Sequence, residues 1–512
     1  MPAPLFPRIP PVFNEFVPKW SRGWIYILTT ICFQLSGIVY GGTMSHMMGD
    51  GCLMREDVMM ITLCGAVGLN MPFPFLFRLK FRFTNRRLVI NAAMVVGICN
   101  LLATTTESVP LLCAISFIAG FFKLCGTFEC MSSAQLWITN KRDFTLFFPT
   151  LYTIVVGGMS IGPYLSAHLA YSLQDWHAMS YIVAIVMMLI VIVFLTCTHD
   201  FRFMKPMPFV GIDYLGMLLW AAVLIEIIFL FNYGEFYNWF DGEPMRIVAA
   251  ALVVTFYLTL WRMNHIRHPY IVPGAWQYKR LLPLLAMFAV EEIINSTPKV
   301  LQNAFVGSVL HLGWMQTDRL QLVEFFGTVC GMSFIVYWVK VLRLPYTKLL
   351  TVGAMALLAY EAMMYCIVMP GLDLPSLYLP VILRCFGYAI FFATLTVYLN
   401  DLMRFEHFFM SLTIVGMIRG GAAGSVCSGL YSLSMRYAIA DNMSRGLPLG
   451  AQQIVVNSIK QLYGATCIMA TIVLLILLVW NIQPVRRMMR RIPLWSAVGR
   501  WMERRRRHGE EA

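Results

Sequence analysis

The chain has 512 residues, of which 59% are hydrophobic and only 13% are charged, and its formal net charge is +13. Charged residues make up about 25% of an ordinary globular chain, so this composition excludes a typical water-soluble protein and indicates a polytopic membrane protein. In that setting the positive charge belongs to loops and tails that orient the chain, and nucleic acid is not an expected partner. The 13 cysteines lack metal-ligand spacing, so we expect reduced, buried thiols and no metal site.

The N-terminal segment, residues 1–22, is rich in proline and is expected to be cytoplasmic. Basic residues run from it directly into an apolar stretch without a small-residue cleavage site, so we expect the first membrane helix to be retained. A membrane span needs about 20 apolar residues, and fourteen candidates follow along the chain. Their approximate limits are 23–47, 57–77, 88–105, 109–138, 144–171, 177–198, 213–233, 245–264, 281–310, 314–340, 346–369, 376–400, 408–435 and 456–482.

The loops between these spans differ in charge. With the N-terminus inside, about 29 of the 39 Lys and Arg residues fall in inside segments and about six fall outside, which is a strong positive-inside pattern. An even number of spans with both termini in the cytoplasm follows from it. The tail, residues 483–512, mixes Arg with Trp, Ile and Leu and is expected to lie on the anionic cytoplasmic leaflet.

The spans divide into two similar halves. We expect an N-terminal six-helix bundle over residues 23–198, an extra two-helix hairpin with flanking loops over 199–280, and a C-terminal six-helix bundle over 281–482. The loops "FRLKFRFTNRRLVI" and "WVKVLRLPYTKLLT" stand at equivalent positions of the two halves, and both are short and basic. A correspondence at this position is typical of a parallel repeat.

One stretch of the fifth span carries a recognisable motif. In "VVGGMSIGPYLSA", Gly158, Gly162 and Pro163 reproduce a G-x-x-x-G-P core. Four further stretches carry the resemblance. In chain order they are "DYLGMLLWAAVLIEIIFLFNYGEFYNWFD", "TPKVLQNAFVGSVLHLGW", "LPVILRCFGYAIFFATLTVYL" and "MIRGGAAGS". In these features the chain resembles the fourteen-helix drug:proton antiporters of the major facilitator superfamily over nearly its whole length.

The resemblance implies an all-α major facilitator fold, with two six-helix bundles and two extra central helices. It implies a secondary active transporter for proton-coupled efflux of amphipathic or lipophilic small molecules by alternating access. A bacterial inner membrane is then the expected location, and the proton gradient is the energy source, without a cofactor. It also implies a periplasmic adaptor and an outer-membrane channel as partners, for which residues 436–455 form the longest outer loop.

The chain departs from the family pattern at several positions. The second basic loop lacks the usual aspartate, the first span lacks an embedded aspartate in "FQLSGIVYGG", and Phe122 stands where the fourth span usually has Arg. These departures keep open an exporter of an anionic amphiphile, such as a fatty acid, bile acid or lysolipid, and a non-transporting sensor derived from a transporter. An enzyme is not expected, because HExxH, GxSxG and P-loop motifs are all absent from the sequence.

The glycines of the fifth span suit close packing in lipid. Gly158, Gly162 and Ser166 share one helical face and let a neighbouring helix approach. Pro163 permits a kink that neighbouring helices absorb. The resemblance implies a bend at the interface between the halves, and simple small-residue packing without a gating role is the alternative.

Ionisable residues at membrane depth are expensive and usually functional. Glu291, Asn295 and Lys299 are spaced i, i+4, i+8, so they are expected to line one stripe facing the central cavity, and a structural ion pair is the alternative. Glu129 is a second candidate proton site, on the opposite face from Lys123. The set assigned to proton coupling or to the cavity is Glu291, Glu292, Asn295, Lys299, Glu129, Lys123, Arg384 and Arg419. Glu324 and Glu361 are expected to snorkel toward an interface without a role.

Three arginines follow the second span. Arg82, Arg86 and Arg87 are expected to form a cytoplasmic gate that pairs with acids or helix C-termini across the two halves, with plain topogenic charge as the alternative. The sequence does not choose among their candidate partners, which are Asp143, Asp213 and Asp401.

Overall fold

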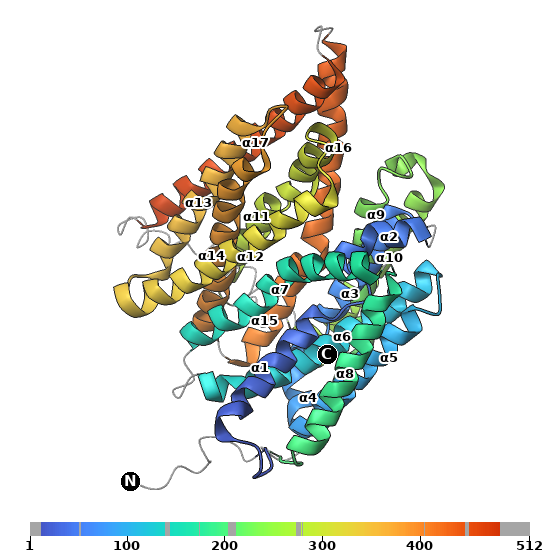
Figure 1. Ribbon diagram of the computed structural model, residues 1–512, viewed down its shortest axis with the longest axis vertical. Coiled ribbons are helices and arrows are strands. Elements are labelled where there is room, and N and C mark those ends of the chain that lie inside the picture. The colour runs from blue at the N-terminus through green and yellow to red at the C-terminus, as the bar shows by residue number, and fades with distance from the viewer. Residues whose placement is uncertain are drawn as a thin grey trace. The chain divides into compact units, whose positions relative to one another are not determined.

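The regular structure of the protein is helical (Figure 1). A computed structural model describes residues 12–50, 53–138, 144–173, 175–202, 211–272, 278, 280–403, 405–445 and 450–481. Within these ranges, β-type pairing is limited to one isolated bridge between Phe13 and Thr198. The all-α class expected from the sequence is therefore confirmed.

The first half of the chain contributes a long series of helices. They are α1 Lys19–Leu35, η1 Gly41–Thr43, α2 Met44–Asp50, α3 Arg55–Asn70, η2 Phe73–Phe75, α4 Leu76–Arg82, α5 Asn85–Ala103, α6 Val109–Ile138, α7 Phe144–Leu173 and α8 His177–Cys197. The central helices are α9 Tyr214–Asn232, η3 Trp239–Asp241 and α10 Glu243–His265.

The second half contains π-helical segments as well as α-helices. Its elements are α11 Leu281–Asn295, η5 Pro298–Gln302, η6 Phe305–Val309, α12 Trp314–Tyr337, η7 Trp338–Leu342, α13 Tyr346–Ile367, η8 Leu374–Leu377, α14 Tyr378–Leu402, α15 Phe405–Met417, η9 Ile418–Ala422, α16 Ala423–Ser444 and α17 Ala451–Asn481. Of these, η5, η6, η7 and η9 are π-helical. The sequence predicts a long outer loop over 436–455, but α16 continues to Ser444 and α17 begins at Ala451. The predicted start of this loop is therefore wrong.

The helices are broadly consistent with the fourteen spans that the sequence predicts. In the described residues, twelve helices are long and apolar enough to cross a membrane. The other two expected spans begin with α1 and α11, which have 17 and 15 residues and continue after an interruption as η1 with α2 and as η5 with η6. The chain is a multi-pass membrane protein.

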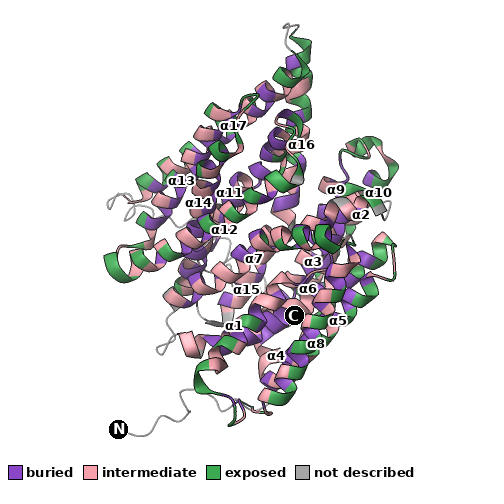
Figure 2. Cartoon of the chain, in the orientation of Figure 1, coloured by how far each residue is buried: buried purple, intermediate pink, exposed green. Residues whose placement is uncertain are grey.

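The outward faces of the helices are apolar, as lipid requires. On α8, the exposed large side chains are Tyr181, Ile185, Met188, Leu189, Ile192 and Leu195. Their spacing of three or four residues places them on one face. Figure 2 shows such exposed faces beside buried ones along the same helices. A stripe of this kind would cause association in water, whereas in a bilayer it contacts acyl chains.

The chain forms two compact units. One comprises Met1–Ile225 with Thr255–Ile271, and the other comprises Glu226–Val254 with Val272–Ala512. In the first unit, α3 packs on α6, and α5 packs on both α6 and α8. In the second unit, α12 packs on α14, and α13 packs on both α14 and α17. The same pairing order in both units is what a parallel repeat produces.

Small residues allow the closest of these helix pairs. A methyl group at Gly68 of α3 would lie 2.0 Å from the backbone oxygen of Phe117, and one at Gly120 of α6 would lie 2.1 Å from that of Gly65. In the second unit, a methyl group at Gly327 of α12 would lie 2.9 Å from the backbone oxygen of Ile382. Helices in lipid associate through such packing, because burial of apolar surface gives little driving force there.

Candidate functional site

Two adjacent glutamates of α11 share one arginine in the second unit. Arg419 lies at the start of η9, and its Nη2 is 3.1 Å from Glu291 Oε1 while its Nε is 3.3 Å from Glu292 Oε1. The Arg419 side chain is 8% exposed, and those of Glu291 and Glu292 are 0% and 4% exposed. A guanidinium can hold two carboxylates at once because it presents several N–H donors in a fixed plane.

Aromatic rings complete the surroundings of Arg419. Its guanidinium carbon lies 3.2 Å from the ring centroid of Phe392 and 5.3 Å from those of Phe288 and Tyr388. Cations are attracted to ring faces, most strongly when water is excluded. The arginine is thereby kept charged in an apolar environment.

The charges of this cluster do not balance when both carboxyl groups are ionised. Two carboxylates then face one guanidinium, which leaves one excess negative charge in a desolvated site. Glu291 Oε2 is buried and has no hydrogen-bond partner among the described residues. Because an unpaired buried charge is costly, one proton on the pair neutralises the cluster, and the vacant oxygen of Glu291 is the atom able to take it.

The polar stripe expected along α11 does not extend to Lys299. The α-helix ends at Asn295, Pro298 follows, and the chain continues as the π-helical η5. The i, i+8 spacing is therefore not preserved on one face. Asn295 is partly buried, and Lys299 is exposed, with its Nζ next to Gly424 of α16. In the described residues, Glu291 pairs with Arg419 and not with Lys299.

A second buried arginine occupies the same unit. Arg384 of α14 pairs with Glu324 of α12 at 2.5 Å, and its guanidinium lies 6.0 Å from the ring of Tyr360. Glu361 of α13 is 0% exposed and contacts the hydroxyl groups of Thr297 and Thr466. The expectation that Glu324 and Glu361 snorkel to an interface is therefore wrong, because both belong to polar networks between helices.

Glu129 of α6 lies in a polar network of the first unit. Its Oε2 is 3.6 Å from Lys80 Nζ, and its Oε1 accepts a 2.6 Å hydrogen bond from Asn85 Nδ2. Tyr26 of α1 donates to the side-chain oxygen of Asn85 at 2.9 Å, and Lys80 also binds Ser132. The sequence suggests neither Lys80 nor Asn85 as a partner, since both belong to a loop-like basic stretch.

Lys123 of α6 is bound by the interrupted end of α1. Its Nζ donates to the backbone oxygens of Gln34 at 2.8 Å and of Ser36 at 2.6 Å. Carbonyl groups at a helix C-terminus lack intrahelical partners and carry partial negative charge. The break after Leu35 therefore creates the site that holds this cation inside the membrane.

The glycine motif of α7, the fifth span, packs against the break that follows α1. A methyl group at Gly42 would lie 2.2 Å from the backbone nitrogen of Ala167, and Gly42 N donates to Ser166 Oγ at 3.0 Å. Methyl groups at Gly158 and Gly162 would meet Gln34 and Leu35 at 3.6 Å, an ordinary contact distance. The close approach is thus made by Gly42 over Pro163 and Ser166, inside the first unit.

The arginines expected at a gate bind partners within the first unit. Arg87 Nη2 is 3.1 Å from Asp200 Oδ2, and Arg86 Nη2 donates to the backbone oxygen of Leu195 at 2.8 Å. The hydrogen bond from Thr84 and the charge of Arg87 hold the pKa of Asp200 below its usual value.

Asp200 was not among the expected partners. Of those three, Asp213 pairs with Arg262 at 2.7 Å, and Asp143 lies outside the described residues. Arg82 lies at the end of α4. The contacts of Arg86 and Arg87 lie within the first unit, and pairing of the basic residues across the halves stays a prediction.

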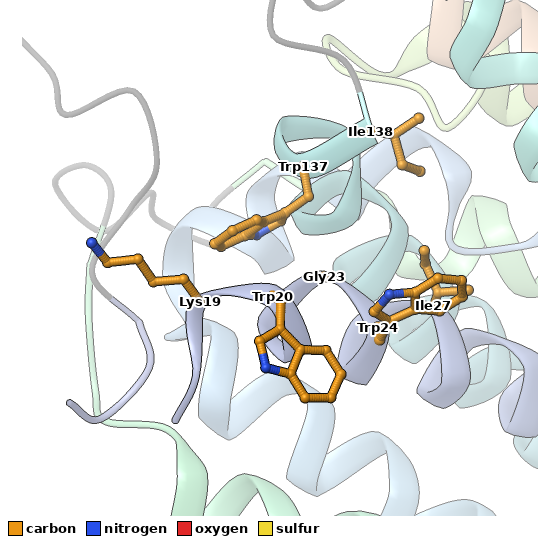
Figure 3. Close-up of a pocket in the computed structure, with 7 residues that line it drawn as sticks. All are labelled: Lys19, Trp20, Gly23, Trp24, Ile27, Trp137 and Ile138. Carbon is orange, nitrogen blue, oxygen red and sulfur yellow. The ribbon is translucent and has the colours of Figure 1, made fainter. Parts of the chain in front are cut away.

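The first unit also has an open cavity of about 450 Å³. Its lining comes from the start of α1 and the end of α6 (Figure 3). The residues are Lys19, Trp20, Gly23, Trp24, Ile27, Trp137 and Ile138. Tryptophan with lysine at helix ends is typical of the membrane–water interface, so this cavity marks where the first unit meets headgroups.

No protein-family model matches the chain, and no curated protein matches it. Solved structures do match in fold. The human organic anion transporter MFSD10 (TETRAN) has a TM-score of 0.53 and 11% identity, over 89% of this chain and 100% of that one.

Two peptide transporters of the POT family match similarly. PepTSo has a TM-score of 0.55 and 14% identity, over 90% of this chain and 98% of that one. An auto-inhibited POT family peptide transporter has a TM-score of 0.56 and 13% identity, over 88% of this chain and 96% of that one. At these identities the likeness establishes the fold, which is of the major facilitator type.

Proposed function

We propose that this chain is a proton-coupled secondary transporter that exports amphipathic or lipophilic small molecules by alternating access. The observation that carries the proposal is the buried cluster in which Glu291 and Glu292 share Arg419. A transporter that uses protons needs a carboxyl group that is neutral when buried and ionised when wet. Two carboxyl groups on one guanidinium supply such a group.

Protonation changes the net charge of the cluster. With one proton, the pair and Arg419 are neutral together and suit a closed, dry site. Loss of that proton leaves a negative charge, which favours a conformation that admits water. Arg419 lies on the π-helical η9, and π-helical segments are rare and often occur at functional positions. Proton exchange at Glu291 would thereby bias one state of the transport cycle over the other.

An anionic amphiphile is the second candidate substrate. Lys299 is an exposed cation on η5, next to the small residue Gly424, and MFSD10, a structural neighbour, is an organic anion transporter. A bacterial inner membrane, cytoplasmic termini and a periplasmic adaptor with an outer-membrane channel remain part of the proposal and rest on the sequence resemblance.

The test is proton movement driven by substrate. The full chain in proteoliposomes carries an imposed pH gradient, and cationic, neutral and anionic amphiphiles are added in turn. We expect at least one compound to collapse the gradient with the wild type and not with Glu291→Gln. Glu129→Gln is compared in parallel because Glu129 is the second candidate proton site, and the variant that loses the response identifies the coupling carboxylate. Compounds that bind by thermal shift without moving protons would contradict proton coupling.

A further inference from the structure

The carboxyl group of Glu361 has an unusual set of neighbours. Its Oε1 lies 3.1 Å from Thr297 Oγ1, and its Oε2 lies 2.6 Å from Thr466 Oγ1. The residue is 0% exposed. No ion pair joins it to a cation in the described part of the chain, because Arg384 pairs with Glu324 instead.

Counting hydrogens indicates which form of Glu361 fits. Each threonine hydroxyl also lies near a backbone oxygen, at 2.9 Å for Thr297 with Ile294 and 3.0 Å for Thr466 with Tyr463. Four oxygen–oxygen contacts therefore depend on hydroxyl hydrogens, and two hydroxyls supply only two. A protonated Glu361 supplies a third. Its O–H then donates to Thr466, whose own hydrogen goes to the backbone, and 2.6 Å is short enough for such a bond.

The wider surroundings also disfavour a charge on Glu361. The titratable groups within electrostatic reach are Tyr360 of the same helix, Arg384 of α14, Tyr431 of α16, and Tyr463 and Cys467 of α17. The one cation among them is held by Glu324 at 2.5 Å. An ionised carboxylate without its own cation is costly in a membrane interior, so the neutral acid is the form that this site accommodates.

A small void lies beside Glu291, one helical turn along the chain from Glu361 and Thr466. Its lining includes Glu291 and Ile294 of α11, Leu357 of α13 and Ala470 of α17, and its volume is about 10 Å³. Leu357 precedes Glu361 by one helical turn, and Ala470 follows Thr466 by one turn. Glu291 Oε2, the oxygen without a described partner, belongs to the residue that lines it.

We propose that Glu361 is a second proton-binding site of this unit, which keeps its proton between Thr297 and Thr466, and that its titration is coupled to that of Glu291. This inference rests on the proposed role of Glu291 in proton coupling.

Infrared spectroscopy of the full chain in lipid nanodiscs tests the protonation state. At neutral pH, Glu361→Gln should lose a carboxylic-acid C=O stretching band, and Thr466→Val should shift that band. Glu324→Gln is the matched control, and it should lose a carboxylate band because Glu324 pairs with Arg384. The glutamine at 361 can still bond both threonines, so the variant should fold. Loss of only a carboxylate band in Glu361→Gln would overturn the proposal.

The link to Glu291 has a separate readout. As the pH is raised, the acid band of Glu361 should disappear at a certain pH, and Glu291→Gln should move that pH by about one unit or more, as expected for coupled sites. Asp373→Asn, an acid in the loop after α13, should leave it unchanged. An unchanged value in Glu291→Gln would overturn the coupling. This result is independent of transport, so wild-type proteoliposomes that move no protons would instead refute the proposed function.

Discussion

Arg419 binds Glu291 through Nη2 and Glu292 through Nε, which a lysine with one ammonium group could not reproduce in the same geometry. The pattern of the sequence identified all three residues as embedded charges. It did not pair Arg419 with the glutamates, because 127 and 128 positions separate them and the break of α11 changes which face each residue occupies. Arg384, Glu324 and Glu361 illustrate the same limit.

Removal of the arginine should be strongly destabilising. Arg419→Gln leaves two buried carboxyl groups without a cation, and breaking one partner of a buried pair costs about 3–5 kcal/mol. We expect a lower free energy of unfolding in detergent, measured by chemical denaturation. The double variant Glu291→Gln, Arg419→Gln should recover part of the loss. If Arg419→Gln and the wild type have the same free energy of unfolding, the cluster does not stabilise the fold.

Asp200 carries a prediction about pH. Its pKa is held low by Thr84 and Arg87, so its contribution to stability is present above the pKa of the unfolded chain and is lost as the pH falls through its lower folded value. The effect is small, because the Asp200 side chain is 39% exposed. Between pH 6 and a pH below about 3.9, the melting temperature of the wild type should fall more than that of Asp200→Asn. Asp373→Asn serves as the control. Parallel curves for all three proteins would contradict this role.

At the scale of elements, the apolar spans were predictable and their interruptions were not. Hydropathy and length locate spans well, so α5, α8 and α13 lie where the sequence places them. The break after Leu35 and the π segments η5 and η9 depend on partners elsewhere in the chain, such as Lys123 and the glutamates of α11. A local pattern carries no information about such partners.

Alanine substitutions can show whether the motif glycines of α7 or Gly42 make the close helix contact. Gly42→Ala places a methyl group against the backbone of α7, and overpacking of this kind typically costs about 1–3 kcal/mol. Gly158→Ala and Gly162→Ala add a methyl at 3.6 Å from the nearest atoms, so they should be nearly neutral. Thermal unfolding in detergent ranks the three variants. If the two motif glycines prove more sensitive than Gly42, the close approach lies in another conformation of the protein.

At the scale of the whole molecule, the two units share a pairing order but not their charges. The first unit places Lys80 and Glu129 between α4 and α6, and the second places Arg419 with Glu291 and Glu292 between η9 and α11. A repeat sets the architecture through packing of small and apolar residues, and single substitutions then distribute charges freely. Sequence therefore indicated the architecture better than the site.

Orientation in the membrane is the remaining prediction at this scale. The distribution of Lys and Arg places the loop at 104–108 outside and the segment after α8 inside. In a variant without other cysteines, Glu107→Cys should react with a membrane-impermeant maleimide added to intact cells. His199→Cys should react only after the membrane is opened. The reverse labelling would invert the topology.

The lysine that binds the broken end of α1 also constrains how the protein is made. Lys123 follows Gln34 by 89 residues, and at roughly 5–20 residues per second of synthesis it emerges about 4–18 s later. During that interval the carbonyl groups at the break have no ammonium to bind. The first helix must therefore wait at the translocon, or in an unbroken form, until the fourth span arrives. Its final shape is a late product of membrane insertion and not the starting template.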